Sequence, residues 1–157
     1  MLLNGVNHVA ILTADAERLH TFYRDVFEAT VLYEKDTPDG FQLSFVDVGP
    51  YSQLNVFQID GNTEAARQTP MFGRGRIDHM GLQAASMAAF DTIRNRLMDL
   101  GSTDGFVTDF GPVLSLFFTD PDGLEGEVCV TNPAAEPGVT HPPGTPAPGY
   151  EVGVKKP

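Results

Sequence analysis

The chain has 157 residues, 41% of them hydrophobic, and its 21 acidic against 10 basic side chains give a formal net charge of −11 at pH 7. This length predicts one domain, or two small halves that share a core. The acidic balance disfavours nucleic acids and anionic membranes as partners, and no stretch approaches the roughly 18 apolar residues of a membrane span. No signal sequence is evident, and the single cysteine, Cys129, excludes an intrachain disulfide. We therefore expect a cytoplasmic protein.

The first half of the chain predicts a strand, a helix and then three more strands. A strand is expected over residues 5–12, where "GVNHVAIL" is apolar around a central histidine, His8. The run "DAERLHTFYRDVFEA" has apolar residues at helical spacing and predicts a helix over 15–28, with Thr13 or Asp15 as its N-cap. The three further strands are expected near residues 29–36, 41–48 and 52–59.

The second half predicts the same order of elements after a polar linker at 61–75. A strand over 76–84 contains "RIDHMGLQ", with His79 at its centre. The amphipathic run "SMAAFDTIRNRLMDLG" predicts a helix over 86–100, with Ser86 as its N-cap. The three further strands are expected near residues 103–109, 112–119 and 124–131.

The two halves therefore look like copies of one unit. His8 and His79 are 71 residues apart, and the same offset carries "GFQLSF" onto "GPVLSL". A repeated supersecondary unit accounts for both matches. The duplication predicts one module at about 5–60 and a second at about 76–131.

Proline and glycine mark the turns and the end of the chain. "DTPDG" at 36–40 and "DPDG" at 120–123 have these residues in the order that turns prefer. From residue 132 to 157 the chain is too rich in Pro and Gly for regular secondary structure. We expect an extended tail there, available to lie across a partner subunit.

The last predicted strand has three polar side chains although its sequence is typical of a core strand. Side chains alternate between the two faces of a strand, so Glu125, Glu127 and Cys129 share the face opposite the apolar one on the last strand. A buried carboxylate costs several kcal/mol unless it is paired or coordinates a metal. Two neutral imidazoles, from His8 and His79, and one carboxylate form a facial triad that leaves one side of an octahedral ion open. The same set can hold zinc.

These residues also have a simpler interpretation that involves no metal. A single histidine in a strand is usually a hydrogen-bonded core residue, and Glu127 alone is equally typical of an edge-strand charge facing water. The recurrence of the histidines in duplicated positions, with a carboxylate on the matching last strand, favours metal binding.

The motifs "NHVAIL", "FYRDVF", "GRGRIDHMGL" and "FFTDPDGLEGEV" resemble the vicinal oxygen chelate superfamily. This superfamily contains glyoxalase I, extradiol dioxygenases, methylmalonyl-CoA epimerase and the bleomycin and fosfomycin resistance proteins. The resemblance covers about residues 5–131. It implies an α+β fold in which two βαβββ modules form a curled mixed sheet around a metal and ligand cavity, a single glyoxalase-like domain at 1–131, and a homodimer.

The resemblance also assigns metal positions. The first strands contribute His8 and His79, and Glu127 on the last strand follows Gly123 at the spacing of the family, which Glu125 does not. The fourth position is expected at Asn55, with Gln53 as the alternative on the same face. Glyoxalase I usually has a second glutamate there, so this sequence departs from its pattern.

The missing second glutamate changes which reaction is expected. Glyoxalase-type and epimerase-type chemistry uses a carboxylate to move a proton next to a carbonyl, and an amide at Asn55 is no base. Extradiol ring cleavage needs only three protein ligands on Fe²⁺, so a dioxygenase acting on a small oxygenated substrate is narrowly favoured, with Glu127 as the catalytic carboxylate. Mn²⁺, Ni²⁺ and Zn²⁺ are alternative metals. His20, on the expected outward side of its helix, and His141, in the tail, are not convincing acids or bases.

A metal-free binding protein is the alternative from another class. Antibiotic-binding members of the superfamily use an acidic groove lined by aromatic residues. The expected cavity here is lined by Phe45, Phe57, Phe117 and Cys129, although the aromatic residues are also typical of a core. A pure binder has no need of all three ligands.

Overall fold

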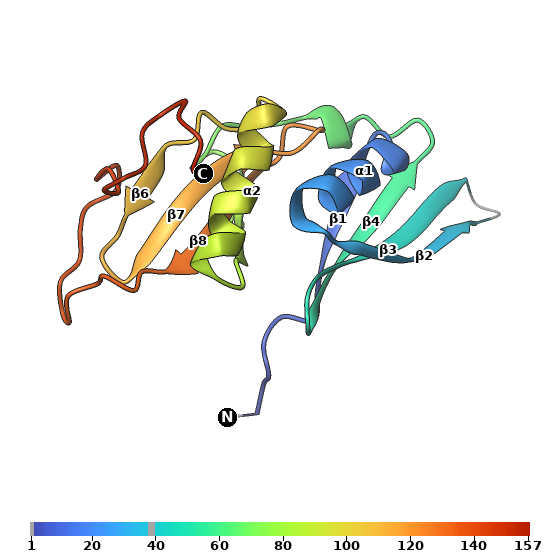
Figure 1. Ribbon diagram of the computed structural model, residues 1–157. Helices are drawn as coiled ribbons and strands as arrows, with labels where there is room; N and C mark the ends of the chain where they lie inside the picture. The colour runs from blue at the N-terminus through green and yellow to red at the C-terminus, as the bar shows by residue number, and fades with distance from the viewer. Residues whose placement is uncertain (1, 38–39) are drawn as a thin grey trace. The chain divides into compact units, whose positions relative to one another are not determined.

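The computed structural model describes residues 2–37 and 40–157 (Figure 1). The chain forms two compact units, one made of the residues up to Thr69 together with Pro121–Gly123, the other of Pro70–Asp120 with Leu124–Pro157. Each unit contains one βαβββ module, so the α+β class and the duplication are confirmed. The strands form two four-stranded sheets rather than one continuous curled sheet.

The first unit has a mixed sheet in the order β1-β4-β3-β2, in which β1 is parallel to β4 and the other neighbours are antiparallel. The predicted turn at 36–40 includes Pro38 and Asp39, which lie outside the described residues. The elements of this unit are β1 (His8–Thr13), α1 (Ala16–Phe27), β2 (Thr30–Asp36), β3 (Phe41–Gly49), β4 (Ser52–Ile59) and the short 3-10 helix η1 (Glu64–Ala66).

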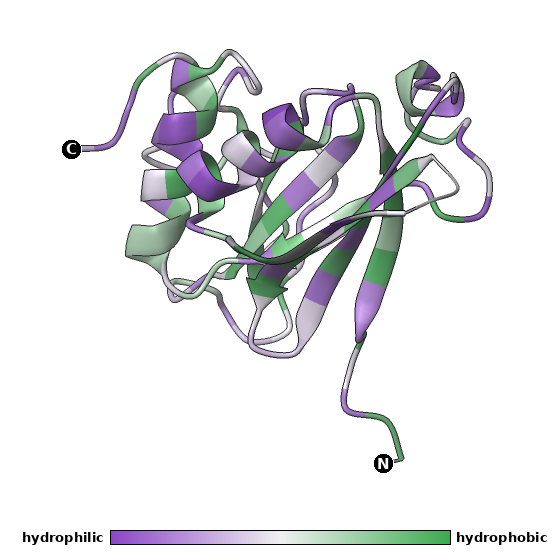
Figure 2. Ribbon diagram, turned by 90° about the vertical axis from the view of Figure 1, so that its right-hand side faces the viewer, coloured by the Kyte–Doolittle hydropathy of each residue, from purple (hydrophilic) through white to green (hydrophobic). Residues whose placement is uncertain are grey.

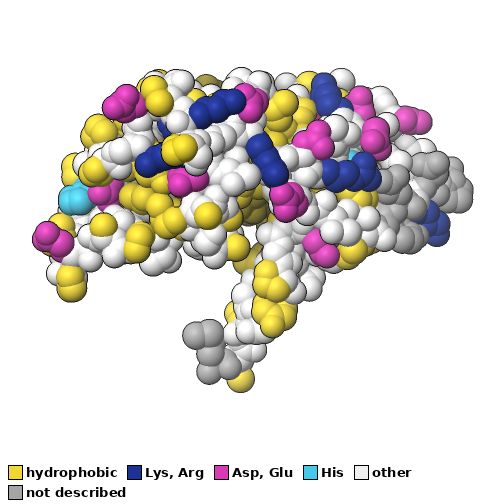
Figure 3. Space-filling model, in the orientation of Figure 1, with side chains coloured by type: hydrophobic (Ala, Val, Ile, Leu, Met, Phe, Trp, Pro, Cys, Tyr) yellow, Lys and Arg dark blue, Asp and Glu magenta, His cyan; other side chains and the backbone are white. Residues whose placement is uncertain are grey.

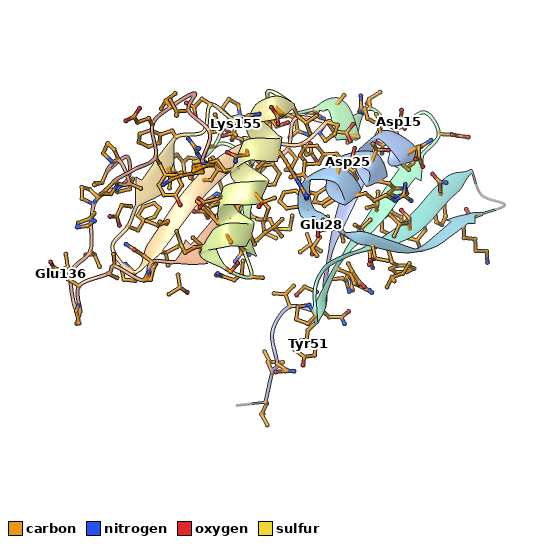
Figure 4. All side chains as sticks on the ribbon, viewed as in Figure 1. Asp15, Asp25, Glu28, Tyr51, Glu136 and Lys155 are labelled. Carbon is orange, nitrogen blue, oxygen red and sulfur yellow. The ribbon has the colours of Figure 1, made fainter. Side chains whose placement is uncertain are left out.

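Helix α1 begins and ends where its flanking residues satisfy the backbone. The Asp15 side chain accepts a hydrogen bond from the Arg18 N–H at 3.0 Å, so Asp15 rather than Thr13 is the N-cap. The helix stops at Glu28, whose φ of 56° is left-handed (both residues are labelled in Figure 4). The helix packs Leu19, Tyr23 and Val26 onto one face of the sheet, where they are buried.

His20 does not point outward as expected. Its side chain is 1% exposed, and its Nε2 lies 2.6 Å from the Ser44 Oγ on β3. Position 20 flanks the apolar stripe of the helix, and the small Ser44 leaves room for an imidazole and supplies a polar partner. Buried polar groups are retained where they are hydrogen-bonded, so His20 is a core residue of the first unit.

The second unit repeats the pattern with a sheet in the order β5-β8-β7-β6. Figure 2 shows hydrophilic and hydrophobic bands alternating along the strands, which fits sheets with one face under a helix. Two strands are shorter than predicted, and His79 lies immediately before β5 rather than inside it. The elements of this unit are β5 (Met80–Gln83), α2 (Met87–Asp99), β6 (Val107–Asp109), β7 (Val113–Thr119) and β8 (Glu125–Thr131).

Helix α2 is capped by Ser86, as predicted, whose hydroxyl oxygen accepts from the Ala89 N–H at 3.1 Å. Its buried face contains Phe90 and Leu97 and, between them, Arg94, whose side chain is 0% exposed. A fully buried guanidinium is unusual and needs partners for its donors. Those partners come largely from the tail.

The tail packs against its own unit. Residues 132–157 have no helix or strand, but the Asp109 N–H donates to the Thr145 carbonyl at 2.8 Å and the Ala147 N–H to the Val107 carbonyl at 2.9 Å. An isolated bridge joins Thr108 and Pro146. This part of the tail therefore runs along the outer edge of β6, as Figure 1 shows.

The end of the tail then reaches α2. The guanidinium of Arg94 donates to the carbonyls of Gly105, Glu151 and Val154, each at 2.8 Å. The Tyr150 hydroxyl donates to Asp91 at 2.7 Å, and its ring packs edge-on against Phe90. Burial lowers the pKa of Arg94 and raises that of Tyr150. The tail is thus an integral part of the second unit.

Neither α1 nor α2 is long and apolar enough to cross a bilayer, and no other helix of the described residues is. On the face seen in Figure 3, Lys and Arg side chains are interspersed with Asp and Glu.

Candidate metal centre

The register of the first sheet places the predicted residues of that unit on one face. His8 pairs with Gln53 and Ala10 with Asn55 across the parallel β1–β4 ladder. Paired residues point to the same side of a sheet. Leu54 and Val56, which alternate with these positions, are buried on the opposite side. His8, Gln53 and Asn55 therefore share the face that α1 does not cover.

The three side chains have different surroundings. The exposed His8 has its Nδ1 2.8 Å from the Asn7 Oδ1. The Gln53 amide donates to Asp47 at 3.0 Å, which occupies it as an ordinary hydrogen-bonding group. The Asn55 Oδ1 is buried and has no hydrogen-bond partner among the described residues. A buried oxygen without a partner costs about 1–3 kcal/mol, so Asn55 rather than Gln53 is the oxygen available to a ligand.

In the second unit, strand β8 presents its polar side chains as predicted. Gly126, Val128 and Val130 are buried, whereas Glu127 and Cys129 alternate with them on the other face. Glu127 pairs with Gly81 across the parallel β5–β8 ladder. A Cβ at Gly81 would lie 3.4 Å from the Glu127 Oε2. The glycine therefore leaves open the space beside this carboxylate.

His79 and Glu127 come together in this space. The His79 Nε2 is 3.4 Å from the Glu127 Oε2, and the imidazole packs edge-on against the Phe117 ring at 5.3 Å between centroids. The buried Ser115 hydroxyl is hydrogen-bonded to the Glu127 Oε1. Two of the three predicted ligands thus converge in the second unit, and His8 belongs to the first.

No group of three His, Cys, Asp or Glu side chains within the described part of the chain is already arranged to hold a metal ion. His79 and Glu127 form a pair rather than a complete site. His141 lies elsewhere in the second unit, with its Nδ1 3.3 Å from Asp109.

Sequence reasoning missed one partner of the pair, Asp78. Its Oδ2 lies 3.0 Å from the His79 Nδ1, and its Oδ1 accepts from the Phe72 N–H. The hydrogen bond with His79 lowers the pKa of Asp78; burial opposes this shift, and the Phe72 N–H and the Arg74 guanidinium add to it. The sequence could have indicated this contact, because a residue with a side-chain oxygen acceptor precedes the histidine in both "NH" and "DH".

Arg74, which belongs to the segment predicted to be a polar linker, also lies beside this pair. Its guanidinium forms an ion pair with Glu125 and donates to the Asp78 carbonyl at 2.9 Å. Glu125 is therefore neutralised by a neighbour, whereas Glu127 faces an imidazole and a hydroxyl. The two carboxylates on one strand face have different partners.

Cys129 is predicted to be unreactive. Burial raises the pKa of its thiol to about 12, and the neighbouring Glu127 contributes through its charge and a hydrogen bond. Because only the thiolate is nucleophilic, a raised pKa lowers the reactive fraction at every pH below it. At pH 8, we expect iodoacetamide to modify Cys129 at least about 100-fold more slowly in the folded protein than in urea. Mass spectrometry of the labelled protein measures both rates, and folded and unfolded rates within threefold of each other would contradict the expectation.

Comparison with known proteins identifies the family. The model described as the Glyoxalase/Bleomycin resistance protein/Dioxygenase superfamily matches residues 5–128, and the chain belongs to that superfamily.

Solved structures share the fold at low identity. A glyoxylase/bleomycin resistance protein/dioxygenase domain from Frankia sp. EAN1pec aligns with a TM-score of 0.69 and 20% identity, over 83% of this chain and 99% of that one. The fosfomycin resistance protein FosX from Listeria monocytogenes aligns with a TM-score of 0.60 and 17% identity, over 83% and 94%. Glyoxalase I from Leishmania major aligns with a TM-score of 0.59 and 21% identity, over 80% and 86%.

Proposed function

We propose that this protein is a metal-dependent enzyme in which His8, His79 and Glu127 hold a divalent ion. The separation of 3.4 Å between the His79 Nε2 and the Glu127 Oε2 carries the proposal. With metal–ligand distances of about 2.0–2.2 Å, two neighbouring ligands of one ion lie about 3.0–3.5 Å apart. This pair therefore has the spacing of two ligands.

Two further donors have the chemistry that such an ion requires. His8 supplies a second imidazole, and the buried Asn55 Oδ1 without a partner supplies a neutral oxygen on the same face as His8. Nitrogen and oxygen donors of this kind suit Fe²⁺, Mn²⁺, Ni²⁺ and Zn²⁺. The structures that resemble this fold include a FosX variant complexed with Mn(II), which supports a divalent ion as the cofactor class.

The reaction that the residues favour is oxidative cleavage of a small dihydroxylated substrate. Fe²⁺ held by two imidazoles and one carboxylate supplies open positions for a diolate and dioxygen. One carboxylate among three ligands leaves a net positive charge that attracts the anionic oxygens of a substrate. Phe117, packed against His79, supplies an apolar wall that excludes water, and Phe45 and Phe57 lie on the same sheet face as Asn55. Asn55 cannot accept a proton as a second glutamate would, which disfavours isomerase chemistry.

The buried Asn55 oxygen without a hydrogen-bond partner supports a second candidate function. If it is a fourth ligand, fewer positions stay open, and the site then suits a glyoxalase-type or epimerase-type reaction, in which the ion acts only as a Lewis acid. Glu127 would then be the group that takes the proton next to the substrate carbonyl. The two candidates differ in whether dioxygen is consumed.

Metal content and dioxygen uptake test the proposal together. We expect the protein as isolated to contain about one divalent ion per chain by elemental analysis, and His8→Ala to contain much less. Metal affinity should fall toward acidic pH, because imidazoles bind metal only when neutral. After anaerobic loading with Fe²⁺, a catechol panel should give ring-cleavage products when oxygen is admitted.

Other results would contradict the proposal in distinct ways. Turnover of a hemithioacetal without oxygen uptake would select the isomerase. Equal metal content in wild type and His8→Ala would exclude His8 as a ligand. Absence of any turnover, with tight binding of a cationic glycopeptide by the metal-free protein, would favour a binding protein.

A further inference from the structure

The two histidines are held by the same local contact. In the first unit the His8 Nδ1 lies 2.8 Å from the Oδ1 of the preceding residue, Asn7. In the second unit the His79 Nδ1 lies 3.0 Å from the Oδ2 of the preceding residue, Asp78. The offset of 71 residues therefore carries Asn7 and His8 onto Asp78 and His79. In both units the side-chain oxygen of the first residue contacts the Nδ1 of the histidine that follows it.

The chemistry of the acceptors decides which ring nitrogen carries the proton. A carboxylate only accepts hydrogen bonds, and so does the oxygen of an amide. In a neutral imidazole one nitrogen donates and the other accepts. The nitrogen that faces Asp78 or Asn7 must be the donor, so the lone pair is on Nε2. In the second unit only the contact of Nδ1 with Asp78 has hydrogen-bond geometry, whereas the Nε2 lies 3.4 Å from the Glu127 Oε2 without donating to it.

The two acceptors differ in charge and in support. Asp78 is held in place by the Phe72 N–H, and the Arg74 Nη1 lies 4.0 Å from its Oδ2. Asn7 is neutral, and its side chain and that of His8 are exposed. A fixed carboxylate orients an imidazole more rigidly than an exposed amide does.

We propose that Asn7 and Asp78 are positioning residues that hold His8 and His79 as the tautomer with the proton on Nδ1 and the lone pair on Nε2. We infer further that the carboxylate of Asp78 makes His79 the stronger of the two ligands. The inference rests on the proposed metal site, for which it names the residues that orient the ligands. Neither residue touches the ion.

The spectra of the metal-free protein test the tautomers without any ion. In ¹⁵N long-range spectra at pH 8, both histidines of the wild type should show a protonated Nδ1 and an unprotonated Nε2. In Asp78→Ala the His79 signals should shift toward the other tautomer, whereas those of His8 should stay unchanged. Asn7→Ala should do the reverse. Asp78→Asn keeps an acceptor and should keep the wild-type tautomer, which separates orientation from general disruption.

Titration with Co²⁺ then tests the effect on ligand strength. We expect Asp78→Ala to raise the Kd for Co²⁺ about 10–100-fold, as is usual for residues that support a metal ligand. Asp78→Asn should have a smaller effect and Asn7→Ala an effect below about threefold. Glu136→Gln, which removes one exposed carboxylate from the tail, is the matched charge control and should leave Kd unchanged.

Each outcome has a defined meaning. A wild-type His79 tautomer in Asp78→Ala would overturn the inference, as would an unchanged Co²⁺ affinity in that variant. An effect of Asn7→Ala equal to that of Asp78→Ala would overturn the ranking of the two ligands. A wild-type protein that binds no Co²⁺ would contradict the proposed function, while its spectra would still decide which tautomers Asn7 and Asp78 impose.

Discussion

Glu127→Gln is expected to weaken Co²⁺ binding about 100-fold or more. The substitution keeps the shape of the side chain and can keep a hydrogen bond to Ser115, but it replaces the anionic donor of the proposed site with a neutral amide. A 100-fold loss corresponds to about 2.7 kcal/mol, a moderate value for removing the charge from a ligand. Calorimetric titration at constant ionic strength measures it directly.

Glu125→Gln is the matched control for that experiment. Glu125 lies on the same strand and the same face, two residues away, and its change in charge is identical, but its carboxylate is paired with Arg74. We expect its effect on Kd to stay below about threefold. Equal losses in the two variants would indicate a general charge effect, and no loss in Glu127→Gln would exclude Glu127 as a ligand.

Glu127→Gln carries a second readout that needs no metal. The charge of Glu127 contributes to the raised pKa of the Cys129 thiol. Its removal should lower that pKa, increase the thiolate fraction at pH 8 and accelerate alkylation. Circular dichroism should match the wild type, because unfolding would also accelerate alkylation. In a folded variant, a faster reaction together with unchanged metal affinity would show that the ligand assignment is wrong.

Arg94→Ala is expected to destabilise the second unit by about 3–5 kcal/mol. The side chain is fully buried and donates to three carbonyls. Hydrogen bonds to charged groups contribute about 1.5–3 kcal/mol each, and the truncation also leaves a cavity under the tail. Burial lowers the pKa of Arg94, which shows that desolvation offsets part of this gain. Urea denaturation measures the loss in the free energy of unfolding, and hydrogen exchange of the α2 amides shows that the loss is in the second unit.

Removal of the tail provides the matching half of a double-mutant cycle. Deletion of residues 142–157 takes away two of the three acceptors, those of Glu151 and Val154, along with Tyr150. In the shortened chain Arg94→Ala should cost at least about 2 kcal/mol less than in the full chain, because interacting residues are not additive. Arg96→Ala, in the same helix and only half-buried, should cost less than about 1 kcal/mol in either background. Additive effects of Arg94→Ala and the deletion would refute the coupling.

The elements that were predicted well are those governed by local rules. Strand alternation and the offset of 71 residues located the modules, because a duplicated sequence must bury the same faces twice. The caps Asp15 and Ser86 follow from the need to satisfy free N–H groups at a helix start. The pairing of His79 with Glu127 follows from β5 and β8 being parallel neighbours.

The features that were missed depend on contacts between distant residues. His20 looked exposed because it lies beside the apolar stripe, and only the small Ser44 opposite makes room for it. The tail has no periodicity, so composition alone could not indicate that its carbonyls satisfy a buried arginine. Asp78 was overlooked because its role depends on the orientation of one ring, which no strand pattern encodes.

The segment along β6 also restricts how copies of this chain can associate. An unpaired edge strand invites a strand from another molecule to extend the sheet. Here Thr145 and Ala147 already occupy the hydrogen-bonding groups of Val107 and Asp109. Pro146 and Pro148 have no N–H to offer a further strand. A homodimer of this protein must therefore use surfaces other than strand addition at β6, and the same segment protects the second unit from growing into fibrillar aggregates on that side.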